Sequence, residues 1–189
     1  MTIDSFGIYS EAEKTVRLCG RRDPVRAARE LGIYVDCTDG FNFLLGMYTV
    51  VNGERHILLN SSLGRATQNI VCAHELGHER LHSRLREDNY YYSDLGLRGE
   101  KSRTEYEANA FAAHFLIGND DIIERMEVYS DVMSLARDLN TEADLVLIKL
   151  SEMRRLGYDV NVPMETDGGF LADLGADSSG EADGFSDGV

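Results

Sequence analysis

The sequence predicts an α+β fold in which a small, mostly antiparallel three-stranded sheet packs on one helix and further helices follow toward the C-terminus. Three β-type runs predict the sheet, at residues 33–35, 43–51 and 56–59. They are separated by Asp39-Gly40 and Asn52-Gly53, and the second dipeptide is a strong signal for a two-residue hairpin. Beyond the third run the apolar residues recur with helical spacing, which predicts the packing helix.

Helical segments are expected on both sides of the strands. Asp23-Pro24, followed by Gly32, predicts a short helix over residues 24–31 with Asp23 as its N-cap. The other expected helices lie at about 9–19, 65–82 and 103–117, and a helical C-terminal part covers about 120–157, with Thr141 as a cap and Gly157 as a stop.

The 189 residues are enough for one ordinary domain with a tail, and their 43% hydrophobic and 28% charged residues are typical of a globular protein. Residues 161–189 contain seven acidic residues, six glycines and neither Lys nor Arg. Such a segment buries little apolar surface. We therefore expect a domain of residues 1–160 and a flexible, acidic, Gly-rich tail of residues 161–189.

The net charge of −14 opposes the neutralisation of phosphates on which nucleic-acid binding depends, so no direct nucleic-acid partner is expected. The most apolar stretches are too short to span a membrane, and the N-terminus is acidic where a secretory signal would be basic and then apolar. The three cysteines have no metal-binding spacing and are expected as free thiols. These features predict a cytoplasmic protein without a membrane partner and leave its oligomeric state open.

His74-Glu75-Leu76-Gly77-His78 is a complete HExxH motif within a predicted helix. Residues four apart lie on one helix face, so both imidazoles can bind one ion while Glu75 is offset toward the water on that ion. This is the arrangement of a zinc hydrolase. His82 lies about 12 Å along the helix from His74 and is expected to pack near the ligands rather than to bind the ion.

A catalytic zinc needs a third protein ligand and an open position for water. The extended pattern HExxHxxGxxH fails, because Leu81 and Arg84 stand at its Gly and His positions. The next predicted helix is therefore the best source of the third ligand, and it carries two glutamates, Glu105 and Glu107.

Glu107 shares a helical stripe with apolar residues and His114, a setting that a carboxylate tolerates when it binds a cation. Glu105 fits a capping box that begins at Ser102. The spacing from Thr104 to Glu107 is the same, so periodicity alone leaves the choice between the two glutamates open.

These segments resemble the ImmA/IrrE zinc metallopeptidases of bacteria, their phages and integrative elements. Residues 73–78 with Leu81-His82, and residues 107–112 on the next helix, carry the resemblance, and weaker similarity extends over about residues 23–157. The resemblance implies a minimal zincin-like fold for residues 1–160, with one Zn²⁺ per chain held by His74, His78 and Glu107. It also implies that Glu75 is the general base and proton shuttle.

The predicted function is a zinc-dependent endopeptidase that cleaves a specific protein. By the resemblance, its substrate and partner is a helix-turn-helix repressor of a mobile element, phage or stress regulon. An oxyanion donor is expected as a further catalytic residue, and His114 is preferred to Tyr90, Tyr91 or Tyr92. Selectivity is expected from docking on residues 83–101 and on the C-terminal helices.

Two other functions stay open at this point. One is a non-catalytic antirepressor or toxin–antitoxin module with a structural zinc, whose fourth ligand would be His82 or His114. The other is DNA binding through a helix pair at residues 132–139 and 142–156. The acidic charge favours instead an αα-hairpin that packs on the core.

Overall fold

A computed structural model of the chain describes residues 4–82 and 100–160. These residues form seven helices and a three-stranded sheet, which confirms the predicted α+β class. The elements are α1 (Ser5–Cys19), α2 (Pro24–Glu30), β1 (Ile33–Thr38), β2 (Gly46–Val51), β3 (Glu54–Asn60), α3 (Arg65–His82), α4 (Glu100–Leu116), α5 (Asn119–Met126), α6 (Val132–Asp138) and α7 (Ala143–Arg155).

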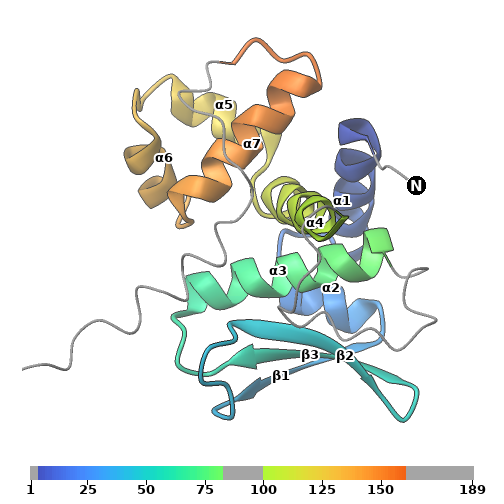
Figure 1. Cartoon of the computed structure of the whole chain (residues 1–189). Coiled ribbons are helices and arrows are strands. Elements are labelled where there is room, and N and C mark those ends of the chain that lie inside the picture. The colour runs from blue at the N-terminus through green and yellow to red at the C-terminus, as the bar shows by residue number, and fades with distance from the viewer. Residues whose placement is uncertain (1–3, 83–99, 161–189) are drawn as a thin grey trace, which may run out of the picture.

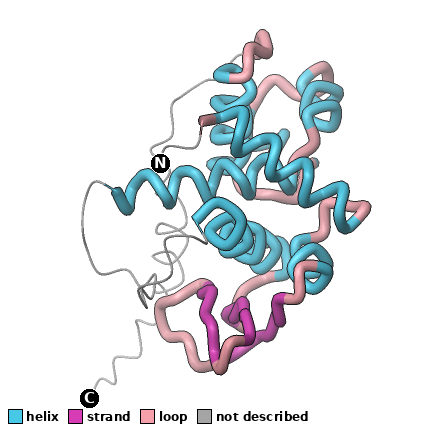
Figure 2. Tube along the Cα trace, turned by 90° about the vertical axis from the view of Figure 1, so that its right-hand side faces the viewer, coloured by secondary structure: helices cyan, strands magenta, loops and turns pink. Residues whose placement is uncertain are grey.

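The elements are stacked in layers from the sheet to the C-terminal helices (Figure 1). α3 packs on β2 and β3, α4 packs on α3, and α7 packs on α4. Figure 2 shows the strands together at one end of the molecule, with the helices to one side of them. α3 and α4 therefore lie at the centre of the stack, between the sheet and the C-terminal helices.

The sheet is mixed, whereas the sequence predicted a mostly antiparallel one. Its order is β1-β3-β2, with β3 antiparallel to β2 and parallel to β1. The hairpin between β2 and β3 is confirmed, since Asn52 and Gly53 both have the positive φ that its turn requires, 52° and 84°. Residues 39–45 connect β1 to β2 past the intervening β3, which is why β1 and β3 run in the same direction.

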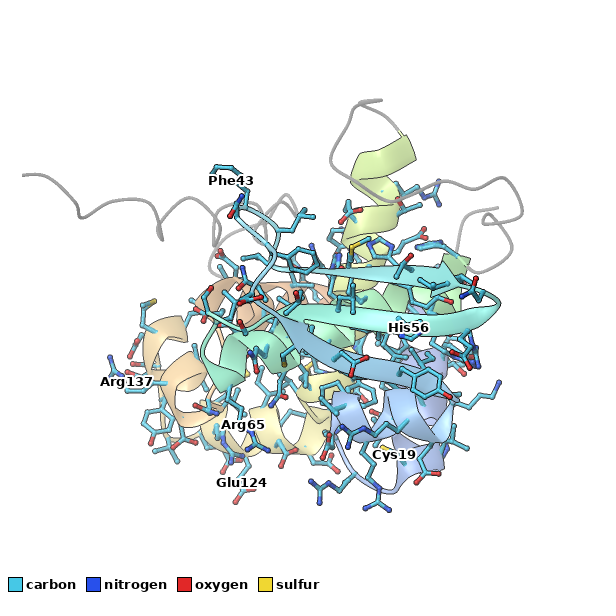
Figure 3. The ribbon with its side chains drawn as sticks, turned by 90° about the horizontal axis from the view of Figure 1, so that it is seen from below. Cys19, Phe43, His56, Arg65, Glu124 and Arg137 are labelled. Atoms are coloured by element: carbon cyan, nitrogen blue, oxygen red, sulfur yellow. The ribbon has the colours of Figure 1, made fainter. Side chains whose placement is uncertain are left out.

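One face of the sheet is covered by α3 and the other faces away from it. On the outward face the rings of Tyr34 in β1 and His56 in β3 stack with 5.1 Å between their centroids. Figure 3 shows the sheet from this side, with His56 in front of the helices. Among the described residues, the packed core therefore lies on the helix side of the sheet.

Two glycines let α3 approach its neighbours closely. A Cβ atom on Gly46 would lie 2.5 Å from Val71 Cγ1 on α3, and a Cβ atom on Gly77 would lie 3.0 Å from the Ala108 carbonyl oxygen on α4. The first distance is too short for a Cβ atom, and the second is tighter than most side-chain packing. These contacts fix α3 against the edge strand β2 on one side and against α4 on the other.

Several predicted helix boundaries agree with the structure. The Asp23 side chain caps α2 by accepting a hydrogen bond from the Arg26 N–H at 3.0 Å. Gly32 follows α2 with a φ of 71°. The prediction of Thr141 as a cap was wrong, because α7 begins one residue later with Glu142 at its N-cap position.

Within residues 4–82 and 100–160, no helix has the length and apolar character needed to cross a membrane. The predicted tail, residues 161–189, lies outside the described residues, and so does most of the predicted docking segment 83–101.

Candidate metal site

The two histidines of the HExxH motif lie one helical turn apart on the face of α3 that meets α4. Their Nε2 atoms are 3.0 Å apart, and their rings meet edge to face with 4.6 Å between centroids. His74 and His78 are both buried, with exposed fractions of 4% and 3%. The predicted convergence of the two imidazoles is thus present in the fold.

Glu105 of α4 completes a three-residue cluster with these imidazoles. Its carboxylate oxygens lie 3.2 Å from His74 Nε2 and 3.4 Å from His78 Nε2. The three candidate ligand atoms lie within 4.8 Å of one another. Because the Glu105 side chain is 36% exposed, the cluster has an opening to solvent. Two imidazole nitrogens and one carboxylate oxygen are a donor set that suits zinc.

The structure brings Glu105 to the imidazoles and turns Glu107, the predicted third ligand, away from them. The Glu107 carboxylate lies 3.5 Å from His82 Nε2 and accepts a hydrogen bond from Arg103 Nε at 3.1 Å. Residues two apart on a helix are separated by about 200° of rotation. The two glutamates therefore cannot both face the same cluster.

The capping role expected for Glu105 depended on the start of the helix. A capping role for Glu105 requires Ser102 at the N-cap, but α4 already begins at Glu100. Glu105 is thus inside the helix, where its side chain is available to the cluster.

Asn109 supports the cluster and was missed by the sequence analysis. His74 Nδ1 donates a hydrogen bond to Asn109 Oδ1 at 2.6 Å, which orients the ring so that Nε2 faces Glu105. Asn109 lies four residues after Glu105, on the same face of α4. That spacing was the signal that could have linked both residues to the histidines.

Glu75 points from α3 toward the edge strand of the sheet. Its Oε2 atom accepts a hydrogen bond from the backbone N–H of Tyr48 in β2 at 2.9 Å. β2 pairs only with β3 among the described strands, so this N–H belongs to the outer edge of the sheet. The predicted general base is thereby fixed in orientation beside the cluster.

The family model of the IrrE N-terminal-like domain matches residues 28–151 of this chain, a range that includes the HExxH helix and the whole of α4. The chain belongs to the ImmA/IrrE family. It is also 28% identical over 121 residues to an uncharacterized immunity region protein of Bacillus phage phi105, covering 62% of this chain and 75% of the phage protein. The predicted resemblance is confirmed, and the ImmA/IrrE family is a family of metallopeptidases.

In this ImmA/IrrE chain His114, the expected oxyanion donor, lies away from the cluster of His74, His78 and Glu105. It is fully buried, and its Nδ1 accepts a hydrogen bond from Lys149 Nζ at 3.0 Å. Its Nε2 lies 3.8 Å from Glu152 Oε2, and its ring packs edge to face on Tyr9. His114 therefore faces α7 and α1. Tyr90, Tyr91 and Tyr92 lie outside the described residues.

The charges around the cluster favour a cation. Burial alone lowers the pKa of His74, but the hydrogen bond with Glu105 and the negative charge of Glu75 outweigh it and raise this pKa. Burial alone raises the pKa of Glu105, but hydrogen bonds with His74 and His78 outweigh it and lower that pKa. Within the described residues, the lowered pKa keeps the Glu105 carboxylate ionised beside the two imidazoles.

Proposed function

We propose that the protein is a zinc-dependent endopeptidase of the ImmA/IrrE type, with His74, His78 and Glu105 as the ligands of one Zn²⁺ per chain. The observation that carries this proposal is the meeting of three donor side chains from α3 and α4, with Glu75 beside them. The 36% exposure of Glu105 supports an open rather than a closed site, as catalytic zinc requires. When bound, zinc supplies a Lewis acid that polarises the scissile carbonyl and makes water more acidic.

Glu75 is the proposed general base. Its carboxylate takes a proton from the attacking water and passes it to the leaving amine, so both steps need it at one position. The hydrogen bond from the Tyr48 N–H holds one carboxylate oxygen against β2. This contact restricts rotation of the side chain and leaves the second oxygen for the proton transfer.

The proposed substrate is a specific protein, a helix-turn-helix repressor of a mobile element, phage or stress regulon. The similarity to an immunity region protein of a phage supports this class. The outer edge of β2 also supports a protein substrate, since the edge of a sheet can pair with a further strand. An extended segment of the substrate would then lie beside Glu75. The net charge of −14 supports a basic protein partner and no direct binding of nucleic acid. We also propose a cytoplasmic location, where such a repressor acts.

A structural zinc with four protein ligands has less support. It would need His82 or His114 as the fourth ligand, and the described part of the chain gathers neither into the cluster. His82 lies instead beside Glu107, and His114 beside Lys149.

The test is turnover of the repressor encoded beside this chain. One part of zinc-loaded protein is incubated with twenty or more parts of purified repressor, and the fragments are followed by mass spectrometry with and without a chelator. Because general-base removal costs about 10²- to 10⁴-fold in rate, Glu75→Gln should bind zinc and lose cleavage. Glu124→Gln, on the exposed face of α5, is the control and should keep full activity.

Chelator-sensitive turnover by the native protein, lost in Glu75→Gln, is the expected result. Cleavage by Glu75→Gln at the native rate would contradict the mechanism. Tight binding of repressor without any fragments, over many hours and with zinc bound, would instead favour the non-catalytic antirepressor.

A further inference from the structure

Three consecutive residues of α4 contact two neighbouring helices, α3 and α7. Glu105 faces His74 and His78 on α3, Tyr106 faces α7, and Glu107 faces His82 further along α3. Consecutive residues of a helix are rotated by about 100°, so one turn of α4 is held from three sides. The rotation of this turn is therefore set by more than the metal site itself.

The contact with α7 is a closed triangle of polar groups. The Tyr106 hydroxyl donates to Glu152 Oε1 at 2.7 Å, and one Arg155 nitrogen donates to both the Tyr106 oxygen at 2.8 Å and Glu152 Oε1 at 2.9 Å. The Arg155 guanidinium also lies over the Tyr106 ring, 5.0 Å from its centroid. Glu152 is fully buried, and the Arg155 side chain that closes the triangle is 56% exposed.

The triangle acts on a residue that is covalently next to the proposed ligand. His74 and His78 lie on α3, which carries no member of the triangle. The position of Glu105 depends on how α4 is rotated about its own axis. A shift at Tyr106 therefore moves Glu105 relative to the two imidazoles on α3.

We propose that Tyr106 is a positioning residue for the metal site, held by Glu152 and Arg155, and that it couples α7 to metal binding. The proposal rests on the proposed metal ligands. Coupling between two sites is reciprocal in free energy. If the triangle on α7 strengthens metal binding, metal binding strengthens the attachment of α7 to α4.

The test compares Tyr106→Phe with Tyr129→Phe. The second variant also removes a tyrosine hydroxyl bonded to an acidic side chain, Asp138, but at an exposed place between α5 and α6. Zinc affinity is measured by competition with a chromophoric chelator, and ligand geometry by the visible spectrum of the Co²⁺-loaded protein. Loss of a group that orients a ligand costs about 10- to 100-fold in metal affinity. We expect about tenfold weaker zinc binding and an altered Co²⁺ spectrum for Tyr106→Phe, and native values for Tyr129→Phe.

Hydrogen exchange of α7 supplies the reciprocal measurement. Zinc should slow exchange of the α7 amides in the native protein and in Tyr129→Phe, and should slow it less in Tyr106→Phe. A merely structural role of the hydroxyl would lower the melting temperature and leave both zinc affinity and the Co²⁺ spectrum of the folded protein unchanged.

Two variants of Glu152 keep the test decisive should Tyr106→Phe fold poorly. Glu152→Gln retains an oxygen that accepts from Tyr106 and should bind zinc more tightly than Glu152→Ala, and Arg155→Ala, at a half-exposed position, should weaken binding least. Native zinc affinity in Tyr106→Phe, or equal affinities in the two Glu152 variants, would overturn the coupling while leaving the metal site intact. Failure of the unmodified protein to bind zinc would overturn the proposed function and the coupling together.

Discussion

At the level of single residues, the choice between Glu105 and Glu107 is open to a direct test. Glu105→Ala removes a proposed ligand, so zinc affinity should fall by more than the roughly 10- to 100-fold cost of losing an outer hydrogen-bond partner. Glu107→Ala removes a carboxylate that contacts His82 and Arg103, so it should keep zinc and lower the free energy of unfolding by about 1–3 kcal/mol. Chelator competition and thermal unfolding measure the two effects.

The reverse result would identify Glu107, and not Glu105, as the zinc ligand. If Glu107→Ala lost its zinc and Glu105→Ala kept it, the arrangement of α4 in solution would have to differ from the one described here. Glu30→Ala, at a largely exposed position in α2, controls for the loss of a carboxylate as such.

Local spacing predicts how the α3 residues of the cluster lie to one another, but not which residue of α4 joins them. His74, Glu75 and His78 lie within one helix, so their spacing alone determines how they lie to one another. Glu105 joins the histidines only across an interface between two helices. The direction of its side chain depends on how α4 is rotated, and thus on where α4 begins and on partners such as Glu152. A local sequence pattern indicates neither of these.

Among the elements, the close crossing of α3 and α4 predicts a strong effect of a single methyl group. Gly77→Ala places a Cβ atom 3.0 Å from the Ala108 carbonyl oxygen, so the helices must separate, at a cost of about 1–3 kcal/mol in the free energy of unfolding. Gly64→Ala is the matched control, because nothing lies within 4 Å of its Cβ position. Chemical denaturation of both variants measures the difference.

Separation of the helices should also weaken the site, since Glu105 would move away from His74 and His78. A Gly77→Ala protein with native stability and native zinc affinity would show that the crossing tolerates a wider spacing than the structure indicates.

Strand pairing shows the limit of local patterns in the same way. The turn at Asn52-Gly53 was predictable because two adjacent residues determine it, and both have the required positive φ. The place of β3 between β1 and β2 was not predictable. Alternation of apolar residues indicates which face of a strand is buried, but not which strands are its neighbours. The sheet was therefore predicted with the right number of strands and the wrong direction for one pair.

In the molecule as a whole, a buried amine links α7 to α4 and α5 and makes stability depend on pH. Lys149 Nζ is buried in α7 and donates to His114 of α4 and to Asn119 Oδ1 of α5. Burial, and then the positive charge of Arg22, lower the pKa of Lys149 to about 7, against the opposing charges of Glu13, Glu152 and Asp121.

The direction of the effect follows from proton uptake on unfolding. The unfolded lysine stays protonated to about pH 10.4, whereas the folded lysine loses its proton above about pH 7, so unfolding takes up a proton between these values. Raising the pH through this range therefore stabilises the fold. From pH 7 to pH 8.5 the native protein should gain about 1.5 kcal/mol relative to Lys149→Met.

Denaturant unfolding at several pH values measures this difference. Lys14→Met, at a position whose side chain is 67% exposed, should follow the native protein over the same range. A constant difference between the native protein and Lys149→Met across the range would show that the buried amine keeps one protonation state.

The central position of β3 also bears on the order of events during folding. Closure of the β2–β3 hairpin brings together residues that are near in the chain, and such a step takes microseconds. Ile33 meets Arg55 only by spanning the whole hairpin, so the parallel pair costs more chain entropy and is expected to form later. Until β1 arrives, a nascent chain would expose the second edge of β3 to other strands, which makes this interval the one most vulnerable to aggregation.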